Sequence, residues 1–409
     1  MSRQPSAPSA STRELRRVLH VVPSFYPAHG YGGPVTALYE LCRAQRAAGL
    51  EVKVLTSDAS GPSRLAAFSG CWVTELGVPT FYAPVRIGED LAPSLLWRIA
   101  RELRWADLVH ISGLWSLTSL LALGEARLWS KPTVLSPHGA LMPWALDGGR
   151  GRQRKLQVLR LLRPLLDRLA GWHVSSDAEA AGLRELTQLG HLPSGIPIGL
   201  IEHGVRPEQI VPHSPPATPP QPRVAQIVVL GRVHPVKNLE LALQSFALLR
   251  ATRPQARLIL AGPTPDAHYL TQLKALADSL GGADSVQWPG LLGPTEKTQL
   301  LGESSVLWLC SHMESFGLVV LEALAAGTPV IAVEGTPWQV LPRAAVGDLV
   351  SPQPGAVAAA TERLLSLPLA EREAQQARCQ RFVAEHYTWP VLEARLRAFY
   401  QQVTASAAR

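Results

Sequence analysis

The sequence predicts an α/β protein with two domains, each built around a parallel sheet. From residue 18 onward, short apolar runs rich in β-branched residues alternate with segments of helical hydrophobic spacing, a pattern typical of parallel strands covered by helices. The chain has 409 residues, more than a single core usually accommodates. Hydrophobic residues make up 46% and charged residues 17%, which favours packed cores and excludes a largely disordered chain.

The first domain is expected over residues 14–212. Residues 1–13 are rich in Ser, Pro and Ala and predict a disordered tail. The apolar run at 18–22 predicts the first strand, and a second run at 132–135 predicts a later one. No repeat of solenoid period is apparent.

A proline-rich segment marks the domain boundary. Residues 213–222 contain five prolines, too many for a helix or a central strand, so residues 213–223 predict a semi-rigid linker. The second domain is then expected over 224–386. Apolar residues at helical spacing near the end of the chain predict a last helix within residues 387–409.

Two carboxylates bracket a Gly-Leu pair in the segment E-S-F-G-L-V-V-L-E at residues 314–322. Helical spacing of the apolar residues predicts a helix that begins at Gly317, with Glu314 in the loop before it and Glu322 inside it. The free N–H groups at Gly317 and Leu318 would face an anion. A sugar attached to a phosphate suits such a site; a buried unit with two solvated glutamates is the alternative.

A second motif carries two cations. The run at 225–230 predicts a buried strand, and the loop G-R-V-H-P-V-K follows it before a helical pattern that begins at residue 239. Arg232 and Lys237 would then lie at the carboxyl end of the sheet, where open α/β folds bind ligands, and both suit phosphate oxygens. The alternative is a solvated basic loop.

Together the two motifs resemble the nucleotide-sugar site of the retaining family 4 (group 1) glycosyltransferases. These enzymes have the GT-B fold, in which two Rossmann-like domains with parallel sheets face each other across a cleft. The first half carries the resemblance too: residues 52–58 look like the family's second strand, residues 24–34 like its glycine loop, and His138 follows a strand where the family places a His over the sugar. Residues 335–339, G-T-P-W-Q, resemble a subgroup with a Thr-Pro-Trp motif.

This chain also departs from the family pattern. Asn238 stands where the family usually has Gly, which is a mild change. Residues 201–206 read I-E-H-G-V-R where the family commonly has I-P-N-G-V-D. Because this loop leads toward the hinge, the difference makes the family's acceptor contacts less certain to apply here than its donor contacts.

The resemblance implies a role for each site residue. Arg232 and Lys237, with the helix start at Gly317 and Leu318, would stabilise the leaving diphosphate. Glu322 would bind the ribose, Glu314 the sugar hydroxyls, and His138 the transferred sugar. The other expected substrate contacts are Gly32, Gly33, Leu292, Ser315 and Phe316. In the resembled fold the last helix crosses back onto the first domain.

The expected reaction is the retaining transfer of a hexose from a UDP- or GDP-linked sugar to a saccharide, lipid-linked in bacterial surface glycan assembly. No cofactor and no metal are expected, because the sequence contains no D-x-D and no zinc-binding spacing. Two alternatives stay open: a soluble sugar or sugar phosphate as acceptor, and a non-catalytic subunit that binds nucleotide sugars.

Positive charge is concentrated in one segment. The net charge is +7, and residues 150–168 hold seven cations and one Asp. Val158, Leu161, Leu162, Leu165 and Leu169 fall on one side of a helical projection, and Pro164 is expected to kink or break the helix. Such a helix could bind an anionic membrane surface; a core-packed helix with a solvated face is the alternative.

Compartment and other partners follow from what the sequence lacks. The basic run has no interleaved aromatic residues, which argues against nucleic acid as a partner. Four cysteines without metal spacing are typical of buried thiols in a reducing compartment, and no apolar signal region is present at the N-terminus. The expected location is the cytoplasm, with peripheral attachment at the inner face of the plasma membrane.

Overall fold

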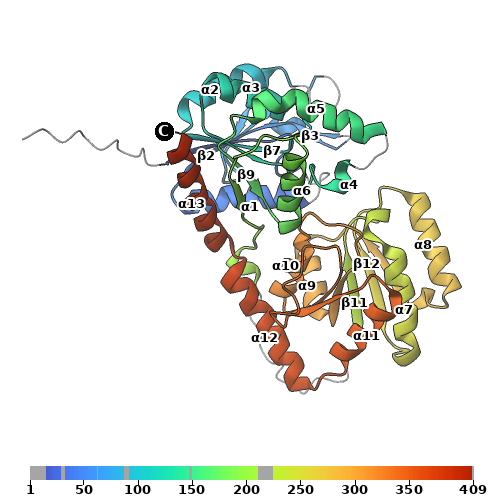
Figure 1. Ribbon diagram of the computed structural model, residues 1–409. Coiled ribbons are helices and arrows are strands. Elements are labelled where there is room, and N and C mark those ends of the chain that lie inside the picture. Colours follow the sequence, from blue (N-terminus) through green and yellow to red (C-terminus); the bar gives the residue numbers. More distant parts are fainter. Residues whose placement is uncertain are drawn as a thin grey trace, which may run out of the picture.

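The computed structural model contains two α/β domains, and its last two helices, α12 (Leu369–His386) and α13 (Trp389–Ala407), run from the second domain back to the first (Figure 1). The described residues are 15–28, 33–61, 63–86, 92–146, 150–210 and 224–407. The expected tail and the linker at 213–223 therefore lie outside the described residues, as does Gly32.

The first domain is built on a sheet of order β10-β9-β8-β7-β1-β2-β6-β5. Its strands are β1 (Arg17–Val21), β2 (Glu51–Ser57), β5 (Trp72–Val73), β6 (Thr80–Ala83), β7 (Leu108–Ser112), β8 (Thr133–Ser136), β9 (Gly171–Val174) and β10 (Ile198–Leu200). All neighbouring strands are parallel except the edge strand β5, which runs antiparallel to β6. A small hairpin pairs β3 (Ala59–Ser60) with β4 (Ser63–Arg64).

Helices cover both faces of this sheet. One apolar cluster lies between the sheet and the helices α2 (Ser94–Trp105), α3 (Leu117–Leu128), α5 (Arg150–Leu166) and α6 (Asp177–Gln188). A second cluster, on the other face, includes residues of α1 (Gly33–Ala47) and α13 (Trp389–Ala407). The short helix α4 (Pro143–Leu146) lies against α5.

The second domain has a parallel sheet of order β13-β12-β11-β14-β15-β16. Its strands are β11 (Gln226–Leu230), β12 (Arg257–Ala261), β13 (Val286–Gly290), β14 (Val306–Leu309), β15 (Val330–Val333) and β16 (Gly347–Val350). One face packs on α7 (Leu239–Thr252), α8 (Ala267–Ser279) and α11 (Pro354–Leu365), and the other on α9 (Pro294–Glu303), α10 (Leu318–Ala325) and α12 (Leu369–His386).

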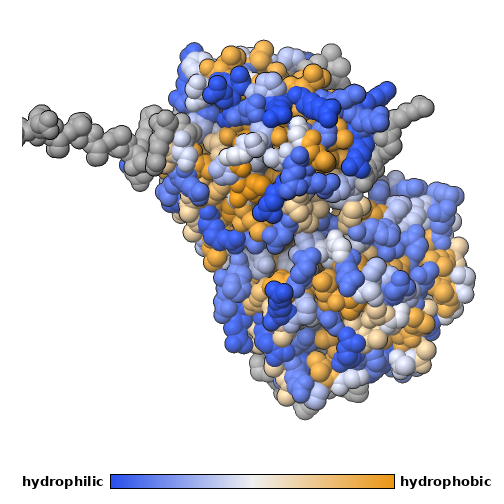
Figure 2. Space-filling view, viewed as in Figure 1, coloured by the Kyte–Doolittle hydropathy of each residue, from blue (hydrophilic) through white to orange (hydrophobic). Residues whose placement is uncertain are grey.

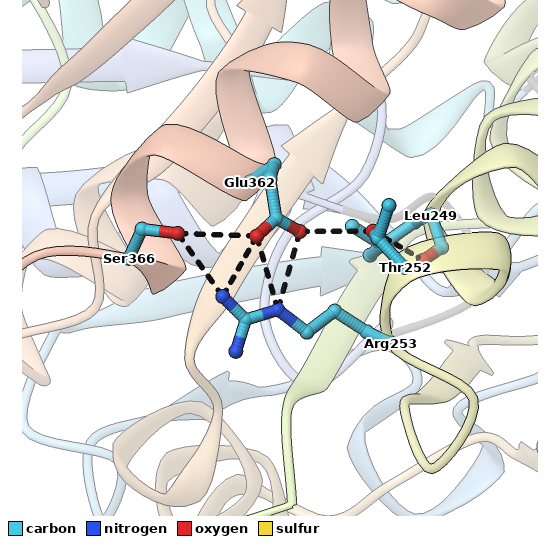
Figure 3. Close-up of polar contacts among 5 residues, drawn as sticks. All are labelled: Leu249, Thr252, Arg253, Glu362 and Ser366. Carbon is cyan, nitrogen blue, oxygen red and sulfur yellow. Dashed lines mark hydrogen bonds and ion pairs between the residues drawn. The ribbon is translucent and has the colours of Figure 1, made fainter.

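An ion pair connects α7 to α11 at the edge of this domain (Figure 3). Arg253, at the end of α7, donates from Nε and Nη2 to Glu362 of α11, at 3.1 and 2.7 Å from Oε1. The guanidinium lowers the pKa of the Glu362 carboxyl. Both side chains are partly exposed, so the pair orients the two helices and contributes little to stability.

The crossing between the domains is fixed by backbone pairing. Val205 N–H donates to Tyr387 O (2.9 Å), and Trp389 N–H donates to Val205 O (3.0 Å). Beyond this point α13 packs against α1. Phe399 of α13 lies so close to the sheet that a Cβ at Gly171 would stand 2.6 Å from its ring and one at Gly199 2.8 Å. Glycine is therefore required beneath the crossing helix.

The structure corrects the expectations for helix α5 and for the cysteines. Helix α5 continues through Pro164 to Leu166, with Pro164 in its last turn, so the proline does not break the helix. Its buried face is formed by Leu159 and Leu166, whereas Val158 and Leu161 are exposed, Leu161 to 79%. Leu162 and Leu169, from the same side of the projection, do pack on the core, so Val158 and Leu161 depart from a core-packed apolar side. Cys71 is exposed, although the other three thiols are buried.

Candidate active site

Each sheet has one point at which the strand order reverses. In the first sheet this point lies between β1 and β7, and in the second between β11 and β14. Ligands of open α/β sheets bind at the carboxyl ends of the strands at such a point. The loops at 231–237 and 310–317 both leave the second reversal, so the two motifs found in the sequence lie together.

Lys237 and Glu314 meet across the second reversal. Lys237 ends a turn of 3-10 helix at Pro235–Lys237 after β11, and Glu314 follows β14. Lys237 Nζ lies 2.5 Å from Glu314 Oε1, which also accepts from Ser311 Oγ at 2.7 Å. Only 17% and 12% of the two side chains is exposed. The ion pair therefore presents one ammonium group and the remaining carboxylate oxygen at fixed positions.

The loop that carries Lys237 depends on unusual backbone conformations. Asn238 has φ +50°, in the left-handed region, where Asn and Gly are the residues best tolerated. An Asn at this position is therefore accommodated at low cost. At Gly262, which follows β12, a Cβ would lie 1.9 Å from Gly231 O. The two backbone segments can approach this closely only because residue 262 has no side chain.

Arg232 lies on the same loop but differs from Lys237 in its surroundings. Its side chain is exposed, and among the described residues it has neither a hydrogen bond nor an ion pair. The guanidinium is free to bind an anion from solvent.

Helix α10 begins as expected at Gly317, which has φ +86° and offers no capping side chain. The first N–H groups of the helix therefore lack a side-chain cap and remain suited to an anion. Glu322 lies one turn inside α10, where its Oε1 is 2.5 Å from Lys297 Nζ of α9. Lys297 did not stand out in the sequence, because no local spacing relates residues on different helices.

The Thr-Pro-Trp segment supports the Glu314 loop. Trp338 is 1% exposed, and its Nε1–H donates to Phe316 O at 2.6 Å. A Cβ at Gly317 would lie 3.2 Å from that nitrogen. The indole thus holds the backbone between Glu314 and the start of α10.

His138 follows β8, and its loop is held by a residue that sequence reasoning missed. Glu179 of α6, 2% exposed, accepts from Gly139 N–H (2.6 Å) and Ser175 N–H (2.9 Å). The sequence S-D-A-E at 176–179, a helix-capping pattern, is the signal that could have identified it. Burial lowers the pKa of His138 to about 4, so the imidazole is neutral at neutral pH.

The first-domain loops contact the second domain around 315–318. A Cβ at Gly139 would lie 2.9 Å from Ser315 Cβ, and one at Gly33 would lie 3.1 Å from Leu318 Cδ1. The ring of His203 stacks on His138 at 6.0 Å and meets Phe316 edge-on at 5.3 Å. His203, 9% exposed, therefore connects the domains.

A pocket of about 380 Å³ opens at the reversal of the first sheet. It is lined by residues that follow β1 and β7 and by the starts of α1 and α3, and His138 forms part of its wall. Leu292, by contrast, lies half-buried after β13 in the second domain.

No group of three or more His, Cys, Asp or Glu that could hold a metal ion occurs in the described part of the chain. No helix among the same residues has the length and hydropathy needed to cross a bilayer.

Comparison with known proteins gives two family matches that together cover most of the chain. Residues 32–189 match the model described as "Glycosyl transferase 4-like domain", and residues 214–381 match "Glycosyl transferases group 1". The mannosyltransferase of Komagataeibacter xylinus named GDP-mannose:cellobiosyl-diphosphopolyprenol alpha-mannosyltransferase is 28% identical over 96% of this chain and 95% of its own.

Two further proteins are similar over nearly the whole length. The D-inositol 3-phosphate glycosyltransferase of Gordonia bronchialis is 27% identical, with coverage of 96% of this chain and 89% of that one. The Anabaena protein Alr3699/HepE, whose structure contains UDP, superposes with a TM-score of 0.71 at 16% identity over 93% of this chain and 98% of its own. This structural likeness is to the GT-B fold.

Proposed function

Because this chain belongs to the group 1 glycosyltransferases and has the GT-B fold, we propose that it transfers a hexose from a nucleotide diphosphate sugar to a saccharide acceptor, with retention and without a metal. The observation that carries the proposal is the Lys237–Glu314 pair at the sheet reversal, opposite the loop of His138 and Gly139.

The cations neutralise the leaving diphosphate. Lys237 and the unpaired Arg232 stand on one loop, and the start of α10 adds uncapped N–H groups. Negative charge grows on the diphosphate as the glycosidic bond breaks, so donors fixed in advance lower the barrier. These three elements take the role that a metal has in other glycosyltransferases.

The carboxylates orient the donor. Glu314 keeps Oε2 for a hydroxyl of the transferred sugar, because Lys237 and Ser311 occupy Oε1. Glu322 is oriented by Lys297 and accepts from the ribose. Neutral His138 forms a hydrogen bond with the sugar beside the reacting carbon. The acceptor hydroxyl attacks that carbon from the same face that the diphosphate leaves.

The acceptor is a lipid-linked saccharide at the inner face of the plasma membrane. The lipid-linked substrate in the name of the Komagataeibacter relative supports this. So does a surface over α2, α3 and α5, termed here the α2/α3/α5 surface, where hydrophobic and hydrophilic groups intermingle in the upper domain (Figure 2). Its exposed apolar residues are Leu96, Trp97, Leu128, Trp129, Val158 and Leu161.

Cations accompany these apolar groups. The guanidinium of Arg104 on α2 lies 4.9 Å from the ring centroid of Trp129 at the end of α3, and Arg127 on α3 donates to Pro164 O of α5. The three helices thus form one continuous surface. Exposed Leu and Trp beside Arg are typical of proteins that lie in the membrane interface.

Incubation with UDP- and GDP-linked hexoses tests the proposal. Purified protein should hydrolyse one donor slowly and transfer its sugar rapidly when acceptor is present, with the anomeric configuration followed by NMR. Nucleotide-sugar binding without hydrolysis or transfer would instead identify a non-catalytic subunit, and an inverted product would contradict retention.

A further inference from the structure

The pocket at the first-sheet reversal has a chemistry that bears on the acceptor. Its volume, about 380 Å³, falls in the range of small-molecule sites, about 300–1,000 Å³. Most of its wall is apolar, with Val22, Pro23, Val35 and Leu38 contributing. None of the described residues that line it is an Asp, Glu, Lys or Arg.

One wall presents an aromatic ring in a fixed orientation. Trp115 is 36% exposed, and its Nε1–H donates to Ala140 O at 3.0 Å. Because this bond occupies the only polar group of the indole, the ring offers an apolar face rather than a donor. The bond also ties Trp115 to the loop of His138. A flat apolar face beside a catalytic loop suits the C–H face of a sugar ring.

A buried hydroxyl in the same wall lacks a partner. Ser112, at the end of β7, is 4% exposed, and among the described residues its Oγ makes no hydrogen bond. An unpaired buried hydroxyl destabilises the fold, because it has lost its hydrogen bonds to water. A rotation of the Ser112 side chain that brings Oγ into the pocket would let a ligand hydroxyl become its partner.

The pocket is poorly equipped for a phosphate. The start of α3 is already capped, because Ser116 Oγ accepts from Ser119 N–H at 3.0 Å. Pro34, in the first turn of α1, has no N–H to donate. Since no Lys or Arg is among the described residues of its wall, a phosphate dianion would lose its hydration there without compensation from a cation.

From these observations, and resting on the proposed glycosyl transfer, we propose that this pocket binds the neutral terminal sugar of the acceptor, stacked on Trp115 and bonded by Ser112 Oγ, and that it discriminates against sugar phosphates. The hydroxyl that is glycosylated then points toward His138, which shares the pocket wall. Any phosphate of the acceptor lies outside the pocket.

A panel of acceptors tests the proposal with the full chain and its donor. Octyl β-glucoside and octyl β-cellobioside represent neutral sugar ends; glucose 6-phosphate and D-inositol 3-phosphate represent phosphorylated ones. We expect kcat/KM at least 100-fold higher for a neutral glycoside. Transfer to the phosphates with equal or greater efficiency would overturn the proposal, as would donor hydrolysis without transfer to either glycoside.

Variants separate sugar binding from folding. Trp115→Ala should raise the acceptor KM at least tenfold and change kcat at saturating acceptor much less, and Trp115→Phe, which keeps an aromatic face, should restore most of the affinity. Ser112→Ala should raise the acceptor KM several-fold. The matched control is Ser245→Ala, which removes a buried hydroxyl that bonds within α7 and should leave KM unchanged.

The failures are distinguishable. If Trp115→Ala lowers donor hydrolysis as much as transfer, the ring has a structural role and the pocket assignment is wrong. If the wild type neither hydrolyses nor transfers any donor, the proposed function itself fails, and this inference fails with it.

Discussion

Lys237 and Glu314 are 77 residues apart in sequence, yet their side chains form an ion pair with 2.5 Å between Nζ and Oε1. The pair spans the place where the second sheet reverses its strand order. It brings the cation of one motif and the carboxylate of the other to a single site. Each motif alone was also compatible with charged side chains that only meet solvent, and the contact between them is what favours a joint function.

The first prediction concerns the two cations. Lys237→Met and Arg232→Ala should each lower kcat by about 10²-fold or more, because each removes a positive group aimed at the leaving diphosphate. Arg232→Ala should leave the urea unfolding midpoint unchanged, since Arg232 is exposed. Lys237 is largely buried against Glu314, so Lys237→Met should also cost some stability. The control Lys274→Met, on the exposed side of α8, should behave as wild type; near-normal kcat in both site variants would remove the leaving-group role.

The second prediction distinguishes the two carboxylates. Glu322→Gln should weaken the binding of free nucleoside diphosphate by about 10- to 100-fold, because an oriented carboxylate–ribose bond contributes about 1.5–3 kcal/mol. Glu314→Gln should leave that affinity largely unchanged and lower kcat with the complete donor. Lys297→Met should also weaken the binding of the nucleoside diphosphate, since Lys297 orients the Glu322 carboxylate. Calorimetry with the diphosphate and kinetics with the donor provide the two readouts, and the opposite pattern would reverse the assignment.

The third prediction concerns metal ions. Transfer should persist in excess EDTA, because Lys237, Arg232 and the start of α10 provide the positive charge that a metal would otherwise supply. The measurement is the initial rate before and after chelation, with Mg²⁺ added back. Complete loss that Mg²⁺ restores would mean that the diphosphate is bound through a metal.

The fourth prediction concerns the α2/α3/α5 surface. The protein should sediment with vesicles rich in phosphatidylglycerol at low salt and be released at about 0.5 M salt, where the Debye length is about 4 Å. Leu128→Gln with Leu161→Gln should weaken attachment through the loss of apolar burial. The matched control is Leu248→Gln, an exposed leucine of the second domain.

Replacing Arg152, Arg160 and Arg163 together by Gln should weaken the same attachment, at about 1 kcal/mol per cation, and spare nucleotide binding. Wild-type protein that stays in the supernatant at low salt would contradict a membrane role for this surface.

The fifth prediction uses a buried carboxylate on α3. Glu125 is 8% exposed, neither of its oxygens has a partner among the described residues, and burial raises its pKa to about 7. Between about pH 4.5 and 7 the folded state retains a proton that the unfolded state releases, so this group makes the fold less stable as the pH rises. The free energy of unfolding of Glu125→Gln is therefore compared with that of wild type at two pH values. Between pH 4.5 and pH 8 the difference should shift by about 1–3 kcal/mol in favour of Glu125→Gln.

Urea unfolding of both proteins at the two pH values provides the test of this fifth prediction. The exposed Glu185→Gln on α6 serves as the control and should show no such trend. A difference between Glu125→Gln and wild type that is independent of pH would mean that Glu125 titrates normally.

Parts of the candidate site were predictable because they depend on local spacing. Gly317 begins α10, and Glu322 lies inside it, as the apolar periodicity indicates. Lys237 ends the turn after β11 as expected. Asn238 is tolerated because its backbone is left-handed, a preference that belongs to the residue itself.

The sequence by itself determined the α/β alternation, the strand that precedes each motif and the residues of the two motifs, because periodicity and capping act between near neighbours. Only the tertiary structure decided the contacts between distant segments: Glu179 on Gly139, Trp338 on Phe316, and the exposed side of α5. These contacts depend on strand order and on the rotation of each helix against its sheet. Successive residues of a helix are turned by about 100° from one another. Local spacing therefore determines which residues share a face of the helix. It does not determine which neighbouring element that face packs against.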